Sequence, residues 1–359
     1  MKLWIALSGG VDSAVTASLV KERYPDPEGV ILRLTDPQTP AARAAQEQDI
    51  EDARGCAELL GLPFRVIDAR EAFRERVIAP FVRAYAQGLT PNPCIFCNKA
   101  LKFGLLLSEA GKAGADGVAT GHYARLSRRE SDGRYQLRKA LSPEKDQSYM
   151  LWGLSQEQLS RCRFPLGDFT KDEVRARAAA LGLSVAHKSD SQDICFVPEG
   201  DYAAFVEAWL GRSFPPGPFT DAAGNVLGQH RGIIRYTVGQ RKGLGIASDA
   251  PLFVTGLYPE ENRVQLSHGE GLFRRLVTAE EVNWVGDGGL DPENRYLVKL
   301  RYRHREQPAR AEFRDGRLLV RFEEPQRAVT PGQSLVIYDE DRVVAGGFIS
   351  RLQPPEESL

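Results

Sequence analysis

The sequence predicts an α/β fold: a parallel sheet with helices on both faces, followed by a small central domain and a C-terminal antiparallel β-barrel. In the first two hundred residues, short apolar runs alternate with helical patterns, which is typical of such a sheet. Later the chain changes to short strand-like runs separated by Gly, Pro and Asp. Because 359 residues exceed one ordinary domain, we expect three, at 1–198, 199–268 and 269–359.

Four apolar runs supply the predicted parallel strands. They are LWIALS, GVILRLT, PFRVIDA and DGVATGH, and helical patterns lie near 12–23, 47–60, 71–87 and 97–113. Thr170 and Glu173 form a capping-box pattern before a helix that Gly182 should end. Ligands of such sheets bind at the carboxyl ends of the strands, so we expect the functional residues there.

The second half of the chain predicts connectors and hairpins. FPPGPF, residues 214–219, suits a rigid non-helical connector. From about residue 270, strand-like runs are separated by Arg-Asp-Gly and Asp-Glu-Asp at the expected hairpin turns. In VKLRYRHRE, strand alternation would put Lys299, Arg301, Arg303 and Arg305 on one face. That basic face suits nucleic-acid phosphates, although a solvated charged surface is the simpler interpretation.

Charge and hydropathy limit the function classes. The net charge of −1 does not by itself indicate nucleic acid, but basic segments at 231–242 and 295–327 suit a polyanion. No apolar run approaches the ~20 residues that cross a bilayer. The start, MKLWIALSGG, leads directly into a Gly-rich loop without a cleavage site. We therefore expect a cytoplasmic protein without a membrane partner, in which reduced cysteines bind metal or perform chemistry.

SGGVDS, residues 8–13, follows the first predicted strand and opens a helix. Its glycines allow positive φ, and the helix offers free N–H groups and a positive dipole end to phosphate. Asp12 suits Mg²⁺ better than phosphate. The loop lacks the Lys of G-x-x-x-x-G-K-[ST] and is not G-x-G-x-x-G, so neither a P-loop NTPase nor a dinucleotide site fits. For Gly-Gly alone, an ordinary strand–helix turn would be preferred.

Three of the five cysteines are candidates for chemistry. Cys94 and Cys97 form a C-x-x-C pair, and Cys195 follows about a hundred residues later. Cys56 and Cys162 lie in helical stretches and suit buried apolar positions. A structural zinc site needs four ligands and is disfavoured at roughly one chance in ten. A thioredoxin-like couple would not be joined to a phosphate loop.

SGGVDS resembles the pyrophosphatase loop of the N-type ATP pyrophosphatases, which implies ATP conversion to AMP and PPi and does not choose the substrate. With the remaining motifs, the chain is similar to the bacterial-type tRNA-specific 2-thiouridylases over nearly its whole length. The matching stretches are ALSGGVDS, TPNPCIFCNKALKFG, ATGHYAR, KDQSYML, DSQDICF, YTVGQRKGLGI, RYR and TPGQS. The resemblance implies replacement of the C2 oxygen of the wobble uridine, position 34 of tRNA, by sulfur.

The resemblance also implies residue roles and partners. Cys195 would carry a persulfide, and Cys97 would be the nucleophile that closes a disulfide with it. The ATP pocket would comprise Ala6, Leu7, Ser8, Gly9, Gly10, Val11, Asp12, Ser13, Leu32 and Gly121. The target base would meet Asn92, Pro93 and Cys94, and tRNA would meet His122, Lys145, Asp146, Gln147, Arg301, Tyr302 and Gln333. The expected partners are a Glu-, Gln- or Lys-type tRNA and a persulfide donor, either a cysteine desulfurase or a sulfur-relay protein.

Purely structural explanations are available for several of these residues. His122 would also suit a satisfied core histidine, and residues 145–147 a surface turn. Lys99 and Lys102 are close in sequence to Cys97 and would lower its pKa, unless the helix turns Lys102 to its far side.

Cys94 stands where many family members carry an acid, and this leaves two mechanisms open. Together with Cys97 and Cys195 it resembles the cysteine triad that holds a [4Fe–4S] cluster in other tRNA thiolases, where an open iron would bind the transferred sulfide. The cluster and the persulfide cycle are therefore both candidates. Two other functions are weaker: another synthetase of the superfamily would not need the cysteines, and a non-catalytic RNA-binding protein would not need SGGVDS.

Overall fold

The computed structural model describes residues 1–37, 39–183, 185, 188, 194–197, 200–286, 288–351 and 353. The chain divides into two compact units, each built from several segments. Unit 1 comprises Met1–Ile78, Cys94–Gln192 and Asp341–Val343, and unit 2 comprises Ala79–Pro93, Asp193–Glu340 and Val344–Leu359.

Unit 1 contains the parallel sheet that the sequence predicts. Its strands are β1 (Leu3–Ala6), β2 (Glu28–Arg33), β3 (Phe64–Asp68), β4 (Gly117–Thr120) and β7 (Cys162–Arg163). They run in the order β3-β2-β1-β4-β7, and every pairing is parallel. β1 is therefore a central strand, buried on both faces, which explains its continuous apolar run. Cys162 lies in β7, not in the predicted helix, and is buried as expected.

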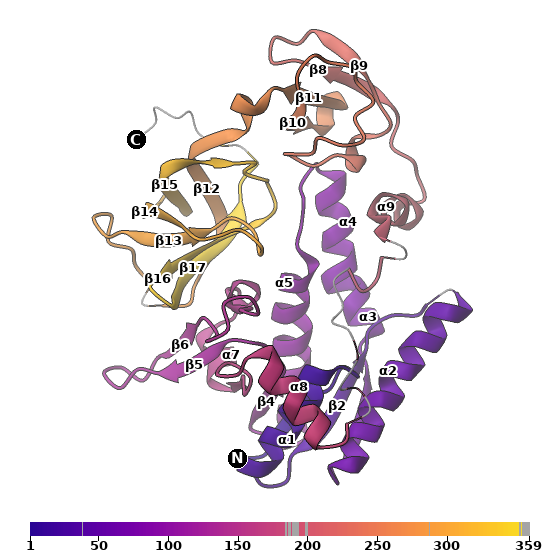
Figure 1. Cartoon of the computed structure of the whole chain (residues 1–359), viewed down its shortest axis with the longest axis vertical. Coiled ribbons are helices and arrows are strands. Elements are labelled where there is room, and N and C mark those ends of the chain that lie inside the picture. Colours follow the sequence, from indigo (N-terminus) through magenta and orange to yellow (C-terminus); the bar gives the residue numbers. More distant parts are fainter. Residues whose placement is uncertain are drawn as a thin grey trace. The chain divides into compact units, whose positions relative to one another are not determined.

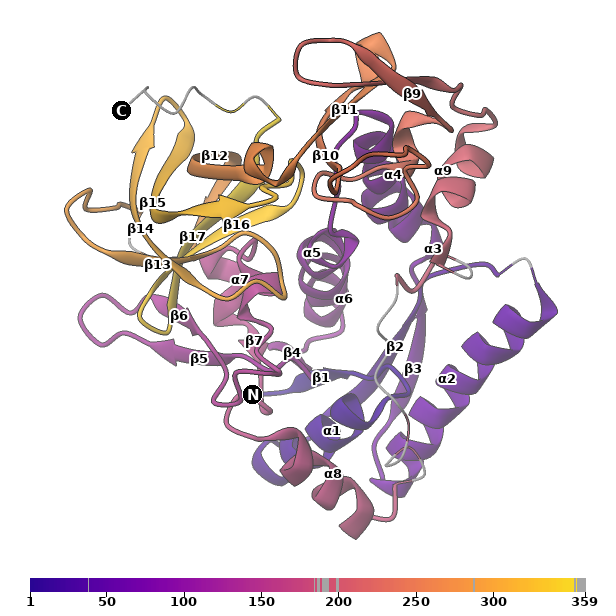
Figure 2. The same ribbon diagram turned by 45° about the horizontal axis from the view of Figure 1, so that its top comes forward.

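Helices cover both faces of this sheet (Figure 1). The helical segments of unit 1 are α1 (Val11–Arg23), α2 (Pro40–Leu59), α3 (Arg70–Phe73), η1 (Arg74–Ile78), η2 (Asn98–Leu105), α6 (Leu106–Lys112), η3 (Ser148–Leu151), α7 (Gln156–Ser160) and α8 (Lys171–Ala180), while α5 (Pro93–Cys97) begins one residue before the unit. Figure 2 shows α1, α2 and α8 on one side of the sheet and α6 on the other. The core between α1, α2 and the sheet includes Ile5, Val15 and Ala57, all fully buried.

The helix α8 begins and ends as predicted. Thr170 Oγ1 accepts from Glu173 N at 3.3 Å, and Glu173 Oε2 accepts from Thr170 N at 2.7 Å, which completes a capping box. Gly182 follows with φ of +66°. A hairpin of β5 (Arg125–Arg128) and β6 (Tyr135–Arg138) also belongs to unit 1.

Unit 2 begins with a small sheet and two packed helices. Its first strands are β8 (Gly217–Thr220), β9 (Val226–His230), β10 (Phe253–Tyr258) and β11 (Arg263–Ser267), in the order β10-β11-β8-β9. The helices are α4 (Ala79–Ala86) and α9 (Tyr202–Leu210), where Tyr85 stacks on Tyr202. The prediction of a connector through residues 214–219 is wrong at its end. Gly217 begins β8, and an ideal Cβ there would lie 2.1 Å from Asn262 O, so this position requires glycine.

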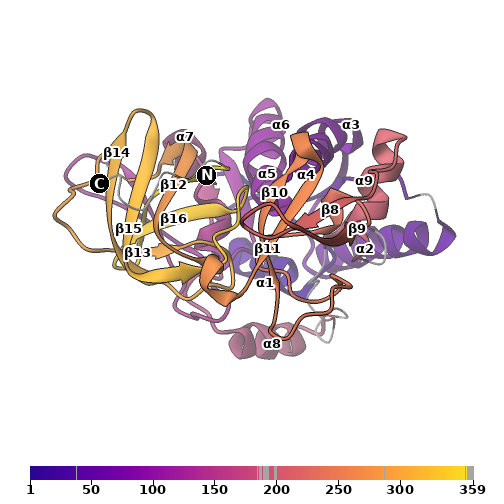
Figure 3. The ribbon, with the colours of Figure 1, turned by 90° about the horizontal axis from the view of Figure 1, so that it is seen from above.

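The C-terminal part of unit 2 is the predicted antiparallel barrel (Figure 3). Its strands are β12 (Phe273–Trp284), β13 (Tyr296–Lys299), β14 (Gln307–Arg314), β15 (Arg317–Arg327), β16 (Ser334–Asp339) and β17 (Arg342–Ile349). They follow the order β12-β15-β14-β13-β16-β17, and β12 pairs with β17 to close the ring. Asp315 and Gly316, both at positive φ, make the predicted tight turn between β14 and β15.

One strand prediction in the barrel is wrong. β13 ends at Lys299, the last residue that pairs with β16, and the chain then turns, with His304 N donating to Arg301 O at 3.0 Å. The strand predicted to place Lys299, Arg301, Arg303 and Arg305 on one face therefore stops at Lys299, although the three arginines are exposed while Tyr302 and His304 are half-buried. The sequence pattern continued past the point where a partner strand was available. In the part of the chain described, no helix is long and apolar enough to span a membrane.

Candidate functional site

The loop Ser8–Ser13 joins β1 to α1 in unit 1 and has the form of an anion site. Gly10, the N-cap of α1, has no side-chain cap, so the first N–H groups of the helix are left for a ligand. Ser8 N donates to Ser13 Oγ at 3.1 Å, and Ser13 Oγ donates to Gly10 O at 2.9 Å, which folds the loop back on itself. Gly9 has φ of +68°, and an ideal Cβ there would lie 2.5 Å from Asp49 O. Only glycine fits this position.

Two residues proposed for the ATP pocket flank this loop. Leu32 lies near the carboxyl end of β2, and Gly121 follows β4. An ideal Cβ at Gly121 would lie 3.0 Å from Ser13 N, so the backbone after β4 closely approaches the phosphate loop. Because β2, β1 and β4 are adjacent, the three segments meet at one edge of the sheet, where the sequence places the site.

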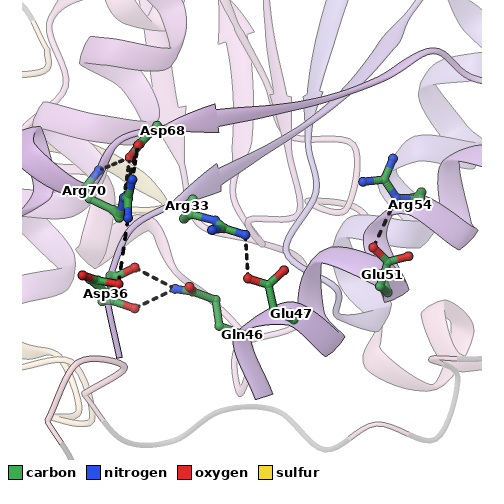
Figure 4. Close-up of polar contacts among 9 residues, drawn as sticks. Arg33, Asp36, Gln46, Glu47, Glu51, Arg54, Asp68 and Arg70 are labelled. Carbon is green, nitrogen blue, oxygen red and sulfur yellow. Dashed lines mark hydrogen bonds and ion pairs between the residues drawn. The ribbon is translucent and has the colours of Figure 1, made fainter. Parts of the chain in front are cut away.

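Polar contacts anchor α2 beside the same edge (Figure 4). Arg33, the last residue of β2, forms an ion pair with Glu47 of α2 at 2.6 Å. Gln46 Nε2 donates to Thr35 Oγ1 at 2.7 Å. Both α2 contacts adjoin the end of β2, next to Leu32.

Asp12 is engaged by two residues that sequence reasoning missed. Its Oδ1 and Oδ2 accept from Lys171 Nζ at 2.8 and 2.9 Å, and Oδ1 also accepts from Tyr123 Oη at 2.8 Å. Lys171 is the first residue of α8, and its side chain is only 8% exposed. The capping box located Lys171 at a helix start, but no local signal joined it to Asp12. With both oxygens on an ammonium, Asp12 as described fits a cationic side chain and not Mg²⁺.

The paired cysteines lie on α5, with Cys94 exposed and Cys97 half-buried. Burial raises the pKa of the Cys97 thiol, the Lys102 charge opposes this, and Cys94 adds to it. The expectation of a lowered pKa is therefore wrong in its net direction, because desolvation outweighs the cation.

A π-helix settles where Lys102 lies. In an α-helix, residues five apart differ in direction by about 140°, which would turn Lys102 away from Cys97. The segment η2 is a π-helix, whose i→i+5 hydrogen bonds bring residues five apart closer to one direction than in an α-helix. The charge of Lys102 acts on Cys97 and also lowers the pKa of His122, so the lysine lies on the cysteine side.

Asn98 is another residue that the sequence did not single out. It follows Cys97, is 2% exposed, and its Nδ2 donates to Met150 O at 3.0 Å. Met150 belongs to η3, within the KDQSYML motif. Asn98 therefore fixes the cysteine-bearing helix to the segment that follows Gln147.

Several residues proposed for tRNA contact make internal contacts. His122 is 9% exposed, its Nδ1 lies 2.7 Å from Thr120 Oγ1, and its pKa is well below the ordinary value because of burial. Asp146 is buried and accepts from Ala140 N at 3.0 Å. Gln147 Oε1 accepts from Tyr123 N at 3.1 Å. These contacts favour a structural role for all three side chains, while Lys145 is half-exposed.

The remaining proposed positions lie in unit 2, which is described by itself. Gln333 Nε2 donates to Thr90 O at 2.8 Å, so the TPGQS loop holds the chain just before Asn92 and Pro93. Arg301 is exposed and Tyr302 half-buried in the turn after β13. Cys195 is exposed, and the rest of its motif, residues 190–193, lies outside the described residues.

The described residues include no group of three His, Cys, Asp or Glu side chains that could hold a metal. Cys94 and Cys97 belong to unit 1 and Cys195 to unit 2.

Three family models match successive parts of the chain. The tRNA methyl transferase HUP domain matches residues 1–199, the tRNA methyl transferase PRC-barrel domain 203–268, and the aminomethyltransferase beta-barrel domain 274–349.

Solved structures are similar at low identity. A U34-tRNA thiolase NcsA from Methanococcus maripaludis with its [4Fe–4S] cluster is 21% identical, with a TM-score of 0.35, over 58% of this chain and 66% of that chain. A 4-thiouridine synthetase in complex with RNA and ATP is 18% identical, with a TM-score of 0.35, over 54% and 44%. Neither likeness bears on the assignment.

Curated relatives match nearly the whole chain. The tRNA-specific 2-thiouridylase MnmA 1 of Caldanaerobacter subterraneus is 45% identical over 97% of both chains. The tRNA-specific 2-thiouridylase MnmA of Acidithiobacillus ferrooxidans is 48% identical over 97% of this chain and 98% of its own. With that identity over that length, the chain belongs to the family of tRNA-specific 2-thiouridylases.

Proposed function

We propose that this enzyme, a tRNA-uridine 2-sulfurtransferase, replaces the C2 oxygen of the wobble uridine, position 34 of tRNA, with sulfur. The observation that carries the proposal is one compact unit holding both an uncapped phosphate loop and a C-x-x-C pair. An amide-forming synthetase would not need the thiols, and an RNA-binding protein would need neither feature. The names of the two relatives, tRNA-specific 2-thiouridylases, support this proposal.

We also propose three domains at 1–198, 199–268 and 269–359. The matches of the family models, 1–199, 203–268 and 274–349, support these boundaries. The first domain would adenylate and thiolate the base, and the other two would hold the tRNA. Of the tRNA-contacting positions, Lys145, Arg301 and Tyr302 are at least partly exposed, which suits contact with a polyanion.

In the first step, ATP adenylates the C2 oxygen of the uridine and PPi leaves. Residues 6–13, Leu32 and Gly121 would hold the nucleotide, with the N–H groups at the start of α1 directed to phosphate. Mg²⁺ would accompany ATP and neutralise its phosphates. Asp12 is paired with Lys171, so no step is assigned to a metal ion on Asp12.

In the second step, the terminal sulfur of a Cys195 persulfide attacks C2 and AMP leaves. The Cys97 thiolate then attacks Cys195 Sγ, breaks the S–S bond and releases the thiolated base. The two cysteines are left as a disulfide, which an external dithiol reduces for the next cycle. Because burial raises the Cys97 pKa, this thiolate forms only as the attack begins, and the departing sulfur of the base takes up the proton. The persulfide donor would be a cysteine desulfurase or a relay protein.

The second candidate for sulfur delivery is a [4Fe–4S] cluster on Cys94, Cys97 and Cys195. An exposed Cys94 one helical turn from Cys97 supports it. Anaerobic purification followed by iron and sulfide counting separates the two candidates. Retained iron that thiolation requires would establish the cluster, whereas full activity of iron-free protein would establish the persulfide cycle.

The decisive assay supplies wobble-uridine tRNA, ATP and a persulfide donor, and measures 2-thiouridine by nucleoside mass spectrometry. We expect Cys97→Ser and Cys195→Ser to reduce thiolation at least about a thousandfold, because neither disulfide closure nor persulfide formation survives. Cys56→Ser is the matched control, since Cys56 is a buried residue of α2. Full activity of Cys97→Ser would overturn its role as nucleophile.

Asp12→Ala tests the wider alternatives. A non-catalytic RNA-binding protein would keep its whole activity in this variant. We expect tRNA binding to persist and tRNA-dependent AMP formation to be lost, because the phosphate loop loses its Lys171 and Tyr123 contacts.

A further inference from the structure

Lys188 joins the phosphate loop to helix α2 within unit 1. Its Nζ donates to Gly9 O at 3.0 Å, Asp49 Oδ1 at 2.7 Å and Asp52 Oδ2 at 2.7 Å. An ammonium has three N–H donors, so these acceptors occupy all of them. Lys188 is 179 residues beyond Gly9 in sequence. Nothing in the proposed reaction uses it.

The Gly9 carbonyl is an informative contact because it shares a peptide group with the Gly10 N–H. In a planar trans peptide the C=O and N–H point in opposite directions. A donor that holds the Gly9 oxygen therefore also directs the Gly10 N–H away from Lys188. Successive N–H groups turned to one side by a residue at positive φ form an anion-binding concavity, and Gly9 has φ of +68°.

The acidic side chains of α2 hold Lys188 in place and keep it charged. Burial lowers the pKa of Lys188, but hydrogen bonds and charges of Asp49 and Asp52 outweigh it, and the net pKa is raised. For Asp52, burial raises the pKa, but the hydrogen bonds from Lys188 and Gln48 and the Lys188 charge produce a net lowering. Lys188 and Asp52 therefore stabilise each other's charged forms.

We propose that Lys188 is a positioning residue of the phosphate loop, which fixes the Gly9 carbonyl toward α2 so that the loop N–H groups stay oriented for pyrophosphate. The inference rests on the proposed function in that ATP is the ligand of this loop. The Lys188 ammonium acts through the loop and does not itself bind phosphate. Asp49 and Asp52 of α2 hold the Lys188 ammonium in place, and we call Lys188 with these two carboxylates the clamp.

The test measures PPi and AMP binding by calorimetry at fixed Mg²⁺, and needs neither tRNA nor sulfur. We expect Lys188→Met to weaken PPi binding about tenfold or more and AMP binding less than twofold, because the loop N–H groups serve the pyrophosphate portion. Lys188→Arg should restore much of the PPi affinity. Lys112→Met is the matched control, since Lys112 is an exposed lysine of α6 that pairs with Glu109.

Asp49→Asn distinguishes a positioning role for Lys188 from direct phosphate binding by Lys188. It also provides a second test if Lys188→Met does not fold. A clamp that loses its anchor holds Gly9 less well, so PPi affinity should fall. A lysine that bound phosphate itself would be released by this change, and PPi affinity would rise. A rise in PPi affinity in Asp49→Asn would overturn the proposal. So would an unchanged PPi affinity in Lys188→Met, or an equal loss of PPi and AMP affinity in that variant. If the wild-type enzyme binds ATP but never thiolates tRNA, the proposed function fails while this inference stands.

Discussion

At the scale of single residues, the site depends on charges that are paired across long stretches of sequence. Lys171 and Lys188 come from the region after β7, yet each contacts the phosphate loop or the helix beside it. Capping at Thr170 could be predicted because its partner is three residues away. The Lys171–Asp12 pair could not, because it depends on α8 packing against α1. The sequence thus located the loop but not the cations around it.

Removal of Lys171 should leave the Asp12 carboxylate uncompensated beside the phosphate site. We expect Lys171→Met to lower the free energy of unfolding by about 1–3 kcal/mol, less than for a fully buried pair, because Asp12 is 29% exposed. ATP affinity should also fall, since the bare carboxylate repels phosphate. Urea denaturation and ATP titration measure the two effects.

The double variant Lys171→Met/Asp12→Asn is the control for that prediction. It removes both charges, so its stability should recover most of the loss. Equal destabilisation in the single and double variants would show that the lysine matters for packing and not for charge.

At the scale of elements, the mistakes have a common origin in partners that lie elsewhere. The pattern of VKLRYRHRE continued as a strand, but β13 ends where its pairing with β16 ends, at Lys299. The π-helix η2 likewise has no signal in the local sequence, although it decides where Lys102 lies. In contrast, β1, β2, β3 and β4 were predictable because each is a short apolar run bounded by loop residues.

The end of β9 should make the small sheet sensitive to acid. His230 Nδ1 accepts from Gly232 N at 3.1 Å, and Nε2 donates to Asn262 O at 2.9 Å. Burial lowers the His230 pKa below its ordinary value near 6.5. As pH falls through 6.5, the unfolded chain takes up a proton that the folded chain does not, so the unfolding free energy declines. Above that pH this contribution is complete.

Thermal unfolding between pH 7.5 and 5.5 measures this contribution. We expect His230→Gln to reduce Tm at pH 7.5 and to make Tm less dependent on pH than in the wild-type enzyme. The comparison of slopes matters, because buried His122 and half-buried His304 also have lowered pKa values and act in the same direction. Identical slopes would remove His230 from the explanation.

At the scale of the whole molecule, the two compact units do not follow the sequence in order. The fold class and the barrel could be predicted from local patterns, but the interleaving could not, because it depends on contacts between distant segments. Residues 79–93 lie within the first matched family model and yet belong to unit 2. There Phe81 packs on Phe196 and Phe205 at 5.1 and 6.5 Å between ring centroids.

A truncated chain of residues 1–198 should therefore expose an apolar surface. We expect it to aggregate more readily than a chain of residues 1–212, which keeps α9, because Phe81 and Tyr85 lose Phe205 and Tyr202. Size-exclusion chromatography of the two fragments measures the difference. Equal monomer fractions would argue against a covering role for α9.

The packing of α4 on α9 also limits where the chain could recombine with another sequence. A recombination event that joined a foreign sequence at residue 199 would preserve every motif of residues 1–198 and still separate Phe81 from Phe205. Replacement of everything after residue 198 as one unit is therefore disfavoured, because Phe81 would lose the ring of Phe205, whereas single substitutions elsewhere leave this contact intact.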